Sequence, residues 1–595
     1  MNQNNPKPEG SHTPAGIPEP MNTAPYTEPP YQPVDPYVGQ APYQQPVNPY
    51  AGQPQYRPPA GSNFVQPPQA ARPSAAPVRT PLRSGKPRDV VMAVIVVITS
   101  FIMVDCLFWV KPLGIGFAAA GTIFLTAAVW YLIPVKRHVS FYTVAGTLLL
   151  FAGSVSPVFS GDSGSKAITL FCMTILYFCM LMDVMDIRVW TPGTFRSIGD
   201  FFYTVFGTSF GRIGAGMYGL FHRDKKDGHK SKAGVGKALL GLLIALPFAA
   251  ILIALLTSGD EAFRGMIEGI DLGDWSGLPK RIAALMISIP LAILLFSQLF
   301  SLRDIRRERR EEGRGVFDPT ILTFFLLGIG AVYIAYLFSQ LAYFFSGFGG
   351  FLPEEFTYAE YARRGFFELT AVSVINILIV ILVSALCKKK QGRLPLGVKL
   401  LSLFLCLFSL VLAGTEIAKM KMYTDAYGLT RLRILTTLFM VFLAIVFLAL
   451  IVQLFFRRFP YLKVAVLFGA LIAVTVSFVS VDRMVADYNV WAYQSGVLET
   501  VDVDTITELG DAAVPALLEL AQDGDEQAAD EAKAELCRRR NSLYQNGAWD
   551  YYMNRRTSDK PAPFDWRGFN TVSYRARQLL LENEAVYLSS DDKTV

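Results

Sequence analysis

The sequence predicts an all-α fold, a polytopic transmembrane helix bundle of about 11 spans. Apolar stretches of about 20 residues recur from residue 90 to residue 481, and this length matches the ~30 Å hydrocarbon core of a bilayer. Hydrophobic residues make up 52% of the 595 residues and charged residues only 17%, against about 25% charged residues in soluble domains. A disordered N-terminal tail and a small helical C-terminal domain flank the predicted bundle.

Residues 1–88 are rich in Pro, Gln, Tyr and Gly and nearly lack aliphatic side chains. Such a composition buries too little apolar surface to offset the entropy of the chain, so we predict a disordered tail with polyproline character. The tail does not begin as a signal peptide does, with a basic start followed by an apolar core. It is either a spacer or an arm that docks a partner, and its composition favours the spacer.

The bundle is predicted over residues 89–481. Its spans share a length near that of the bilayer core and few charges. They are expected at 90–110, 113–134, 139–160, 166–185, 238–257, 282–302, 320–345, 366–387, 396–418, 434–455 and 463–481. The segment 186–236 is rich in glycine and aromatic residues but is interrupted by Arg212. We predict that it is an interfacial or re-entrant segment on the cytoplasmic side.

Arg and Lys are unevenly distributed among the connections between these spans. With the N-terminus inside, the inner segments hold about 28 basic residues and the outer connections about 11, as the positive-inside rule requires. The net charge of +6 is therefore attributed to cytoplasmic loops and not to nucleic-acid binding. We predict a multi-pass protein of the cell membrane with a cytoplasmic N-terminus. Because the number of spans is odd, the C-terminal domain at 482–595 is expected to be extracytoplasmic.

The C-terminal domain has the composition of a soluble helical segment. Asp511 is expected to cap a helix over AAVPALLELA, with Pro515 in its first turn. A second helix is expected over EQAADEAKAELCRRRNSL and a last one over residues 573–585. The first two would form an antiparallel hairpin.

Basic residues also occur on the predicted outer face, where the positive-inside rule leaves few. In FTYAEYARRGFFEL, residues 356–369, Thr357 and Glu360 have the spacing of a capping box, which predicts a helix start ahead of the apolar run. This entry into the eighth span carries Tyr358, Tyr361, Arg363, Arg364 and Glu368. A second outer connection, EIAKMKMYTDAYGLTRLRI at 416–434, carries Glu416, Asp425, Tyr427, Arg431 and Arg433.

Charges at membrane depth are costly unless they are paired or hydrated. We therefore predict an outward-facing charged groove in which the arginines of the two connections meet Glu368, Glu416 and Asp425. The groove is either a structural ion-pair network or a binding site. As a binding site it would take an anionic lipid headgroup or an envelope protein partner, since Arg suits phosphate and carboxylate groups.

Asp105 lies inside the first span, one to two turns from its outer end. An intramembrane carboxylate is a functional candidate, although one so close to the end can also face the interface. The six cysteines contain no CxxC pair, the four histidines are scattered, and no Ser–His–Asp set is recognisable. The sequence thus predicts no catalytic residue, no cofactor and no metal site, and an enzyme is the least favoured class.

Four stretches carry a resemblance to a known family. EYARRGFFEL (360–369), YGLTRLR (427–433), ADYNV (486–490) and VDTITELGDAAVPALLEL (503–520) occur in this order. Together they resemble a bacterial family of polytopic membrane proteins, of the domain of unknown function 4173 or 4153 type. The resemblance covers roughly residues 240–585. It implies an integral membrane protein of the bacterial envelope and supplies no catalytic residues or substrate.

These observations favour a non-enzymatic sensor or scaffold whose outward-facing groove binds a lipid or a protein partner. The alternative is a transporter of a small anionic or lipid-like substrate. Pro247 and Pro290 would break two spans, as in many transporters. However, no internal repeat is recognisable and the charges gather at the rim of the bundle, so we place the transporter second.

Overall fold

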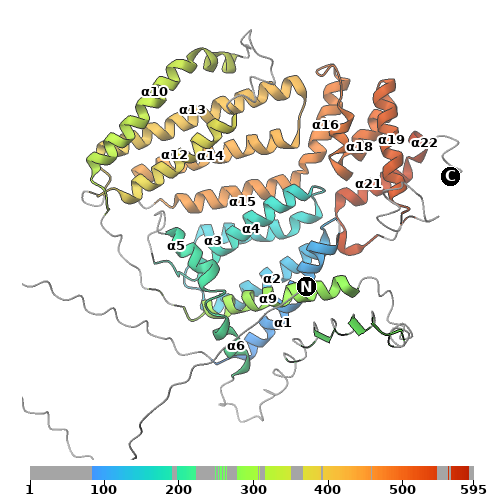
Figure 1. Ribbon diagram of the computed structural model, residues 1–595, viewed down its shortest axis with the longest axis horizontal. Coiled ribbons are helices and arrows are strands. Elements are labelled where there is room, and N and C mark those ends of the chain that lie inside the picture. The colour runs from blue at the N-terminus through green and yellow to red at the C-terminus, as the bar shows by residue number, and fades with distance from the viewer. Residues whose placement is uncertain are drawn as a thin grey trace, which may run out of the picture. The chain divides into compact units, whose positions relative to one another are not determined.

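In the computed structural model of this protein, the described part of the chain consists mainly of α-helices (Figure 1). The residues that the structure describes are 84–110, 112–189, 197–222, 278–305, 307, 315–349, 366–389, 393–456, 459–545, 561, 564–588 and single positions between 241 and 263. Over these residues there is no β-strand, and β-type pairing is limited to isolated bridges such as the one between Phe317 and Cys387. The predicted all-α fold is confirmed.

Ten helices in the described part of the chain are long and apolar enough to cross a membrane. The first five are α1 (Pro87–Trp109), α2 (Ile115–Leu132), α3 (Phe141–Val155), α4 (Ser163–Val184) and α9 (Leu278–Leu302). The other five are α10 (Pro319–Gly349), α12 (Phe366–Leu386), α13 (Leu396–Tyr427), α14 (Arg431–Phe455) and α15 (Tyr461–Val479). They correspond to ten of the predicted spans. The span predicted at 238–257 lies mostly outside the described residues.

Polar side chains set the starts of several spans. Ser140 caps α3 by accepting a hydrogen bond from the backbone N–H of Thr143. Asp162 caps α4 by accepting from the N–H groups of Gly164 and Ser165. Such caps satisfy N–H groups that have no partner within the helix, and each stabilises the helix by roughly 1 kcal/mol.

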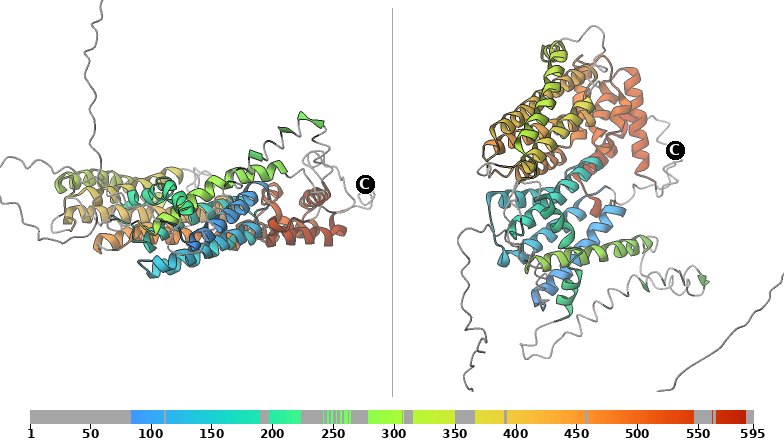
Figure 2. Two further views of the ribbon diagram at one scale, coloured as in Figure 1. Left: turned by 90° about the horizontal axis from the view of Figure 1, so that it is seen from below. Right: turned by 60° about the vertical axis from the view of Figure 1, so that its left-hand side comes forward.

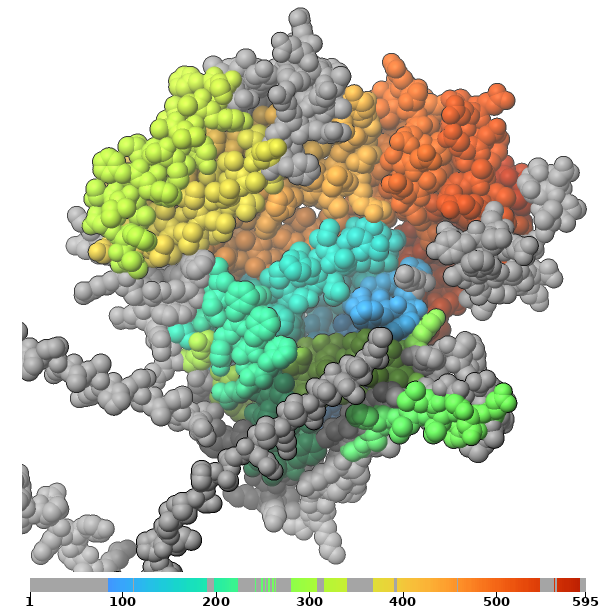
Figure 3. All heavy atoms as spheres, viewed as in Figure 1, coloured from blue at the N-terminus to red at the C-terminus, as the bar shows by residue number. Residues whose placement is uncertain are grey.

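Large apolar side chains are exposed along the outer faces of the spans. Leu148, Phe324 and Phe338 are between 65% and 74% exposed. Helix α10 lies at the outer edge of the bundle (Figures 1 and 3). Only 17% of its most apolar 18-residue stretch is buried. Soluble proteins avoid apolar surfaces of this extent, so acyl chains are the solvent that suits these faces.

Helix α15 joins two groups of spans. On one side it packs against α14, and on the other against α3 and α4 (Figure 1). The Thr169 hydroxyl of α4 donates a hydrogen bond to the backbone oxygen of Ala473 at 2.9 Å and lies 2.7 Å from the Ser477 hydroxyl. Small and hydroxyl residues allow helices to approach closely in a bilayer, where the hydrophobic effect does not drive association.

Spans that follow one another directly in the chain run in opposite directions, so each end of the bundle contains the starts of some spans and the ends of others. The end where the C-terminal helices follow is called the tail end, and it contains Trp109, Ser163, Arg431 and Val479. The opposite end is called the loop end, and it contains Pro87, Val184, Leu302 and Tyr461. Figures 1 and 2 show the C-terminal helices together at the tail end.

The C-terminal helices pack around one apolar core that also includes Val476 of α15. They are α16 (Val481–Gln494), α17 (Val503–Thr507), α18 (Val514–Asp523), α19 (Glu526–Ser542), α21 (Thr571–Glu582) and α22 (Glu584–Tyr587). Ser480 adopts a left-handed conformation with φ of 52°, which turns the chain sharply between α15 and α16. The prediction that Asp511 caps a helix is wrong, because a 3₁₀ turn over Gly510–Ala513 intervenes and α18 begins at Val514.

In the segment predicted to be interfacial, the described residues form two short helices at the loop end, α5 (Ser197–Phe202) and α6 (Ile213–Phe221), while 190–196 and 223–236 lie outside the described residues. A π-helical turn over Tyr203–Gly207 follows α5 directly. The exposed rings of Phe202 and Phe206 stack at 6.1 Å between centroids and form an apolar stripe along it. Such an amphipathic segment suits the membrane interface.

Close approach of α6 to α9 depends on glycine. A Cβ atom added to Gly219 would lie 2.2 Å from the ring of Phe300, which is only 1% exposed and has no room to move. A Cβ atom added to Gly214 would meet no atom within 4 Å.

We expect Gly219→Ala to lower the free energy of unfolding by about 1–3 kcal/mol, because the added methyl group overpacks this contact. Gly214→Ala is the matched control on the same helix. It should leave the stability unchanged or raise it by up to about 1 kcal/mol, since Ala favours helix more than Gly does. Thermal unfolding of the detergent-solubilised chain measures both. Equal stability of the two variants would contradict the packing account.

Candidate functional site

Four residues of the predicted groove lie outside the described part of the chain: Tyr358, Tyr361, Arg363 and Arg364. The shared groove between the two connections therefore stays a prediction. The other candidates have defined positions, and these place the principal charged contact of the tail end at Arg431.

Arg431, the first residue of α14, is held by two buried carboxylates. Its Nε and Nη2 atoms bind Oδ1 and Oδ2 of Asp482 at 2.6 and 2.8 Å. Its Nη1 atom lies 3.1 Å from Oδ1 of Asp162. The prediction that Arg431 meets Glu368, Glu416 or Asp425 is wrong, because its partners come from the cap of α4 and from α16. One guanidinium thus connects two spans to the first C-terminal helix.

The two carboxylates respond differently to this environment. Burial raises the pKa of Asp482 above its ordinary value, and the hydrogen bonds from Arg431 only partly offset this. Burial also acts to raise the pKa of Asp162. There, however, hydrogen bonds from Ser165 and Gly164, together with the charge of Arg431, bring the pKa below the ordinary value. Asp482 is therefore the carboxylate of the pair that takes up a proton first as the pH falls.

Asp105 has a partner from the far end of the chain. Arg567 Nη1 lies 2.7 Å from Asp105 Oδ2, and Arg567 Nη2 lies 2.9 Å from Oδ2 of Asp565. The hydrogen bonds from Arg567 lower the pKa of Asp565. Of the two interpretations of Asp105 from the sequence, neither included an ion pair with the C-terminal domain.

The contact at Asp105 is extended by the backbone. The N–H of Ile115, at the start of α2, donates to the carbonyl oxygen of Phe569 at 2.9 Å. A Cβ atom added to the neighbouring Gly114 would lie 2.2 Å from that same oxygen. The segment at Trp566–Phe569 is therefore seated directly on the ends of α1 and α2.

The remaining candidates have separate environments. Arg433 donates to the backbone oxygen atoms of Tyr427, at 3.0 Å, and of Gly428, and its guanidinium stacks over the Tyr423 ring. Glu416 is 1% exposed, and its Oε1 lies 3.6 Å from Nζ of Lys419. Glu368, Asp425 and the side chain of Tyr427 are exposed. Among the described residues, these acidic groups are not the partners of Arg431 or Arg433.

A cavity of about 250 Å³ lies among the C-terminal helices beside the Arg431 contact. Two basic residues line it, Arg483 of α16 and Arg575 of α21, together with one acidic residue, Asp511. The remaining lining residues are Ala512, Pro515, Thr571, Val572 and Ala576. We call it the C-terminal cavity. Because Arg483 directly follows Asp482, the cavity and the Arg431 contact share one turn of α16.

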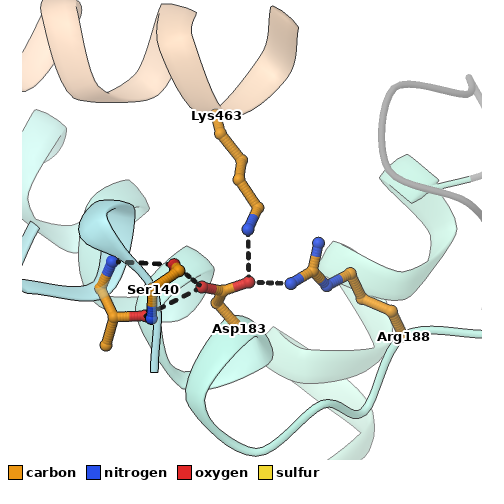
Figure 4. A network of polar contacts seen from close by, with 5 residues as sticks. Ser140, Asp183, Arg188 and Lys463 are labelled. Atoms are coloured by element: carbon orange, nitrogen blue, oxygen red, sulfur yellow. Dashed lines mark hydrogen bonds and ion pairs between the residues drawn. The ribbon is translucent and has the colours of Figure 1, made fainter. Parts of the chain in front are cut away.

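The loop end contains a second buried cluster, centred on Asp183 near the end of α4 (Figure 4). The hydroxyl groups of Ser140 and Thr143 donate to its Oδ2 atom at 3.3 and 3.0 Å. Lys463, from the start of α15, donates to its Oδ1 atom at 2.5 Å, and Arg188 donates to the same oxygen. Asp183 is 1% exposed, so the cluster holds the starts of α3 and α15 to the end of α4.

Two further buried aspartates at this end bind basic residues that follow α9. Asp89 accepts from the Tyr131 hydroxyl at 2.7 Å and from Arg303 at 3.1 Å. Asp200 accepts from Arg307 at 2.9 Å and from the N–H of Val189 at 2.9 Å. In the sequence these arginines were interpreted only as a topology signal, and their partners were not predicted. The sequence did contain one signal for these partners, an acidic residue at the boundary of an apolar stretch.

Comparison with known proteins identifies the family. The profile of the family described as Domain of unknown function (DUF4153) matches residues 144–520. The chain belongs to this family. Together with the apolar helices, this membership identifies a multi-pass integral membrane protein. The predicted resemblance is confirmed, but the match begins and ends earlier than the expected 240–585.

The extent of the match separates the contacts described above. Arg431, Asp162 and Asp482 lie within the matched residues, as does Asp183, whereas Asp105 and Arg567 lie outside them. Comparison with curated proteins and with solved structures gives no significant match. In the residues that the structure describes, no three His, Cys, Asp or Glu side chains gather as metal ligands do.

Replacement of Arg431 tests its role in stability. Arg431→Gln should lower the free energy of unfolding by about 2–3 kcal/mol, because two buried carboxylates lose their shared cation. The expected loss is below the ~3–5 kcal/mol typical of a fully buried pair, since a third of the Arg431 side chain is exposed.

The matched control is Arg483→Gln, which replaces an arginine next to Asp482 on α16. Arg483 makes a largely exposed pair with Asp487 at 3.3 Å, which is worth less than about 1 kcal/mol. Unfolding in mixed micelles by increasing SDS measures both variants. A loss for Arg431→Gln no greater than that for the control would refute the proposed importance of the shared guanidinium.

Proposed function

We propose that this protein is a non-enzymatic sensor or scaffold of the cell membrane that binds an anionic ligand in its C-terminal cavity. The cavity carries this proposal, because two arginines line it, the pair that Arg483 makes with Asp487 is largely exposed, and guanidinium groups suit an anionic ligand. Phosphate or carboxylate groups of an envelope lipid or protein partner are ligands of this chemistry. The site replaces the predicted groove as the preferred place for recognition.

The position of the cavity supports a sensing role. A ligand that draws Arg483 and Arg575 together would shift α16, and Asp482 on the same turn would change its contact with Arg431. Arg431 also touches Asp162, so the shift would reach the starts of both α4 and α14. Ligand binding and the arrangement of the spans would then be coupled through one guanidinium.

The proposed orientation places the loop end in the cytoplasm and the C-terminal helices outside it. The excess of Arg and Lys in the connections of the loop end supports this. So do Arg–aromatic contacts at that end, where Arg88 lies over Trp130, Arg303 over Tyr131 and Arg307 over Tyr203. Basic and aromatic side chains are typical anchors at a membrane interface.

A transporter of a small anionic or lipid-like substrate is the second candidate. Pro290 lies inside α9, as the sequence suggested for a transporter, but α9 continues without a break from Leu278 to Leu302, whereas the binding sites of transporters are typically formed by broken helices. The ion pairs described above also lie near the two ends of the bundle and not at its middle, which favours the sensor or scaffold.

Binding of a soluble headgroup tests the proposed ligand class. We expect glycerol phosphate, but not glycerol, to raise the Tm of the full chain in zwitterionic nanodiscs. The double variant Arg483→Gln/Arg575→Gln should require at least tenfold more glycerol phosphate for the same shift, because charge-assisted hydrogen bonds contribute about 1.5–3 kcal/mol each.

Arg577→Gln provides the matched control, since Arg577 lies on the same helix as Arg575 but does not line the cavity. It should respond as the unaltered chain does. The proposed ligand class is wrong if glycerol phosphate and glycerol act alike, or if the double variant retains the response.

A further inference from the structure

A second cavity lies at the loop end, bounded by α3, α4, α5 and α15. Its volume is about 210 Å³. Apolar side chains form most of its wall, among them Ile175, Cys179, Phe201 and Val466. Ile175 is eight residues before Asp183 on α4, so the cavity extends about 12 Å along the helix from the charged cluster. We call it the loop-end cavity.

Polar groups gather at one end of this cavity. Arg188 and Lys463 both line it, and both bind the single carboxylate of Asp183 (Figure 4). The other oxygen of Asp183 is already occupied by the hydroxyl groups of Ser140 and Thr143. Arg188 and Lys463 thus share one oxygen of the Asp183 carboxylate, and Asp186 is close enough to interact electrostatically with Lys463.

Tyr142 adds an unused polar group to the same end. Its hydroxyl oxygen is buried and has no hydrogen-bond partner among the described residues. The ammonium group of Lys463 lies 4.8 Å from the centre of the Tyr142 ring. A buried hydroxyl without a partner costs about 1–3 kcal/mol, so a ligand oxygen at this position would be stabilising.

The wall formed by α5 connects the cavity to the lipid-facing surface. Phe201 lines the cavity, while Phe202 and Phe206, which follow on the same helical segment, are each 53% exposed. Lys463 lies at the start of one span and Asp183 near the end of another. The charged end of the cavity is therefore at the depth where headgroups meet acyl chains.

We propose that the loop-end cavity binds one anionic phospholipid of the adjoining leaflet. Its phosphate lies at Lys463, Arg188 and the Tyr142 hydroxyl, and part of an acyl chain lies along the apolar wall toward Ile175. A zwitterionic lipid binds less well, because its headgroup cation opposes Lys463 and Arg188. This site is separate from the C-terminal cavity, and the inference does not rest on the function proposed there.

The charged end is tested with the full chain in nanodiscs of phosphatidylcholine containing a minority of phosphatidylglycerol. Native mass spectrometry then measures which lipid stays bound to the protein. We expect the unaltered chain to retain phosphatidylglycerol in preference to phosphatidylcholine. Lys463→Gln should reduce this preference about fivefold, which is the effect typical of one basic residue near an anionic headgroup. Lys399→Gln is the matched control: Lys399 lies over the Phe455 ring at the same end but does not line the cavity.

The apolar wall is tested without altering any charge. Ile175→Phe should fill the cavity and reduce phosphatidylglycerol retention at least as strongly as Lys463→Gln does. Ile168→Phe is its control, because Ile168 is two turns away on the same face of α4, is 41% exposed and does not line the cavity.

Three results would overturn the inference. One is the absence of any preference for phosphatidylglycerol in the unaltered chain. Another is an equal effect of each variant and its control. The last is displacement of the lipid by inorganic phosphate at millimolar concentration, which would indicate a site for a free anion with no role for the acyl chain.

Discussion

The structure depends on one guanidinium that is shared by two buried carboxylates. Arg431 lies where α4, α14 and α16 meet, and it compensates the charge of Asp162 and of Asp482. Removing a carboxylate from water is costly unless a cation and hydrogen bonds replace the hydration shell. Each of these two acids is therefore stable in its buried position only while the three helices remain together, so the contact specifies how the C-terminal helices sit on the bundle.

The same principle recurs at both ends of the bundle. At the tail end, Arg567 joins the C-terminal segment to Asp105 of α1. At the loop end, Asp183 joins α3, α4 and α15 through two cations and two hydroxyl groups. Between the ends, the contacts are mainly apolar or involve small and hydroxyl residues. Since lipid chains are as apolar as the helices themselves, apolar contacts alone do not select partners among the spans, and the polar contacts supply that selectivity.

The sequence predicted ten of the described spans correctly, because the length of an apolar stretch is a local property that the bilayer thickness constrains. The partners of the charged residues were not predicted, since they depend on which spans become neighbours. Asp482 is 51 residues from Arg431, and Asp105 is 462 residues from Arg567. Burial of Glu416 could not be inferred either, because its neighbour Lys419 suggested an exposed rim. The expected cap at Asp511 failed because a 3₁₀ turn, which has no distinct sequence pattern, precedes α18.

Hydrogen–deuterium exchange of the full chain in nanodiscs, with and without Arg431→Gln, tests the central claim most directly. If the shared guanidinium holds α16 to the bundle, the variant should exchange faster at the backbone amides of α16 and of the first turn of α4. The amides of α19, which do not depend on this contact, should exchange at an unchanged rate. Unchanged exchange in both α16 and α4 would contradict the account and would mean that apolar packing alone keeps the C-terminal helices in place.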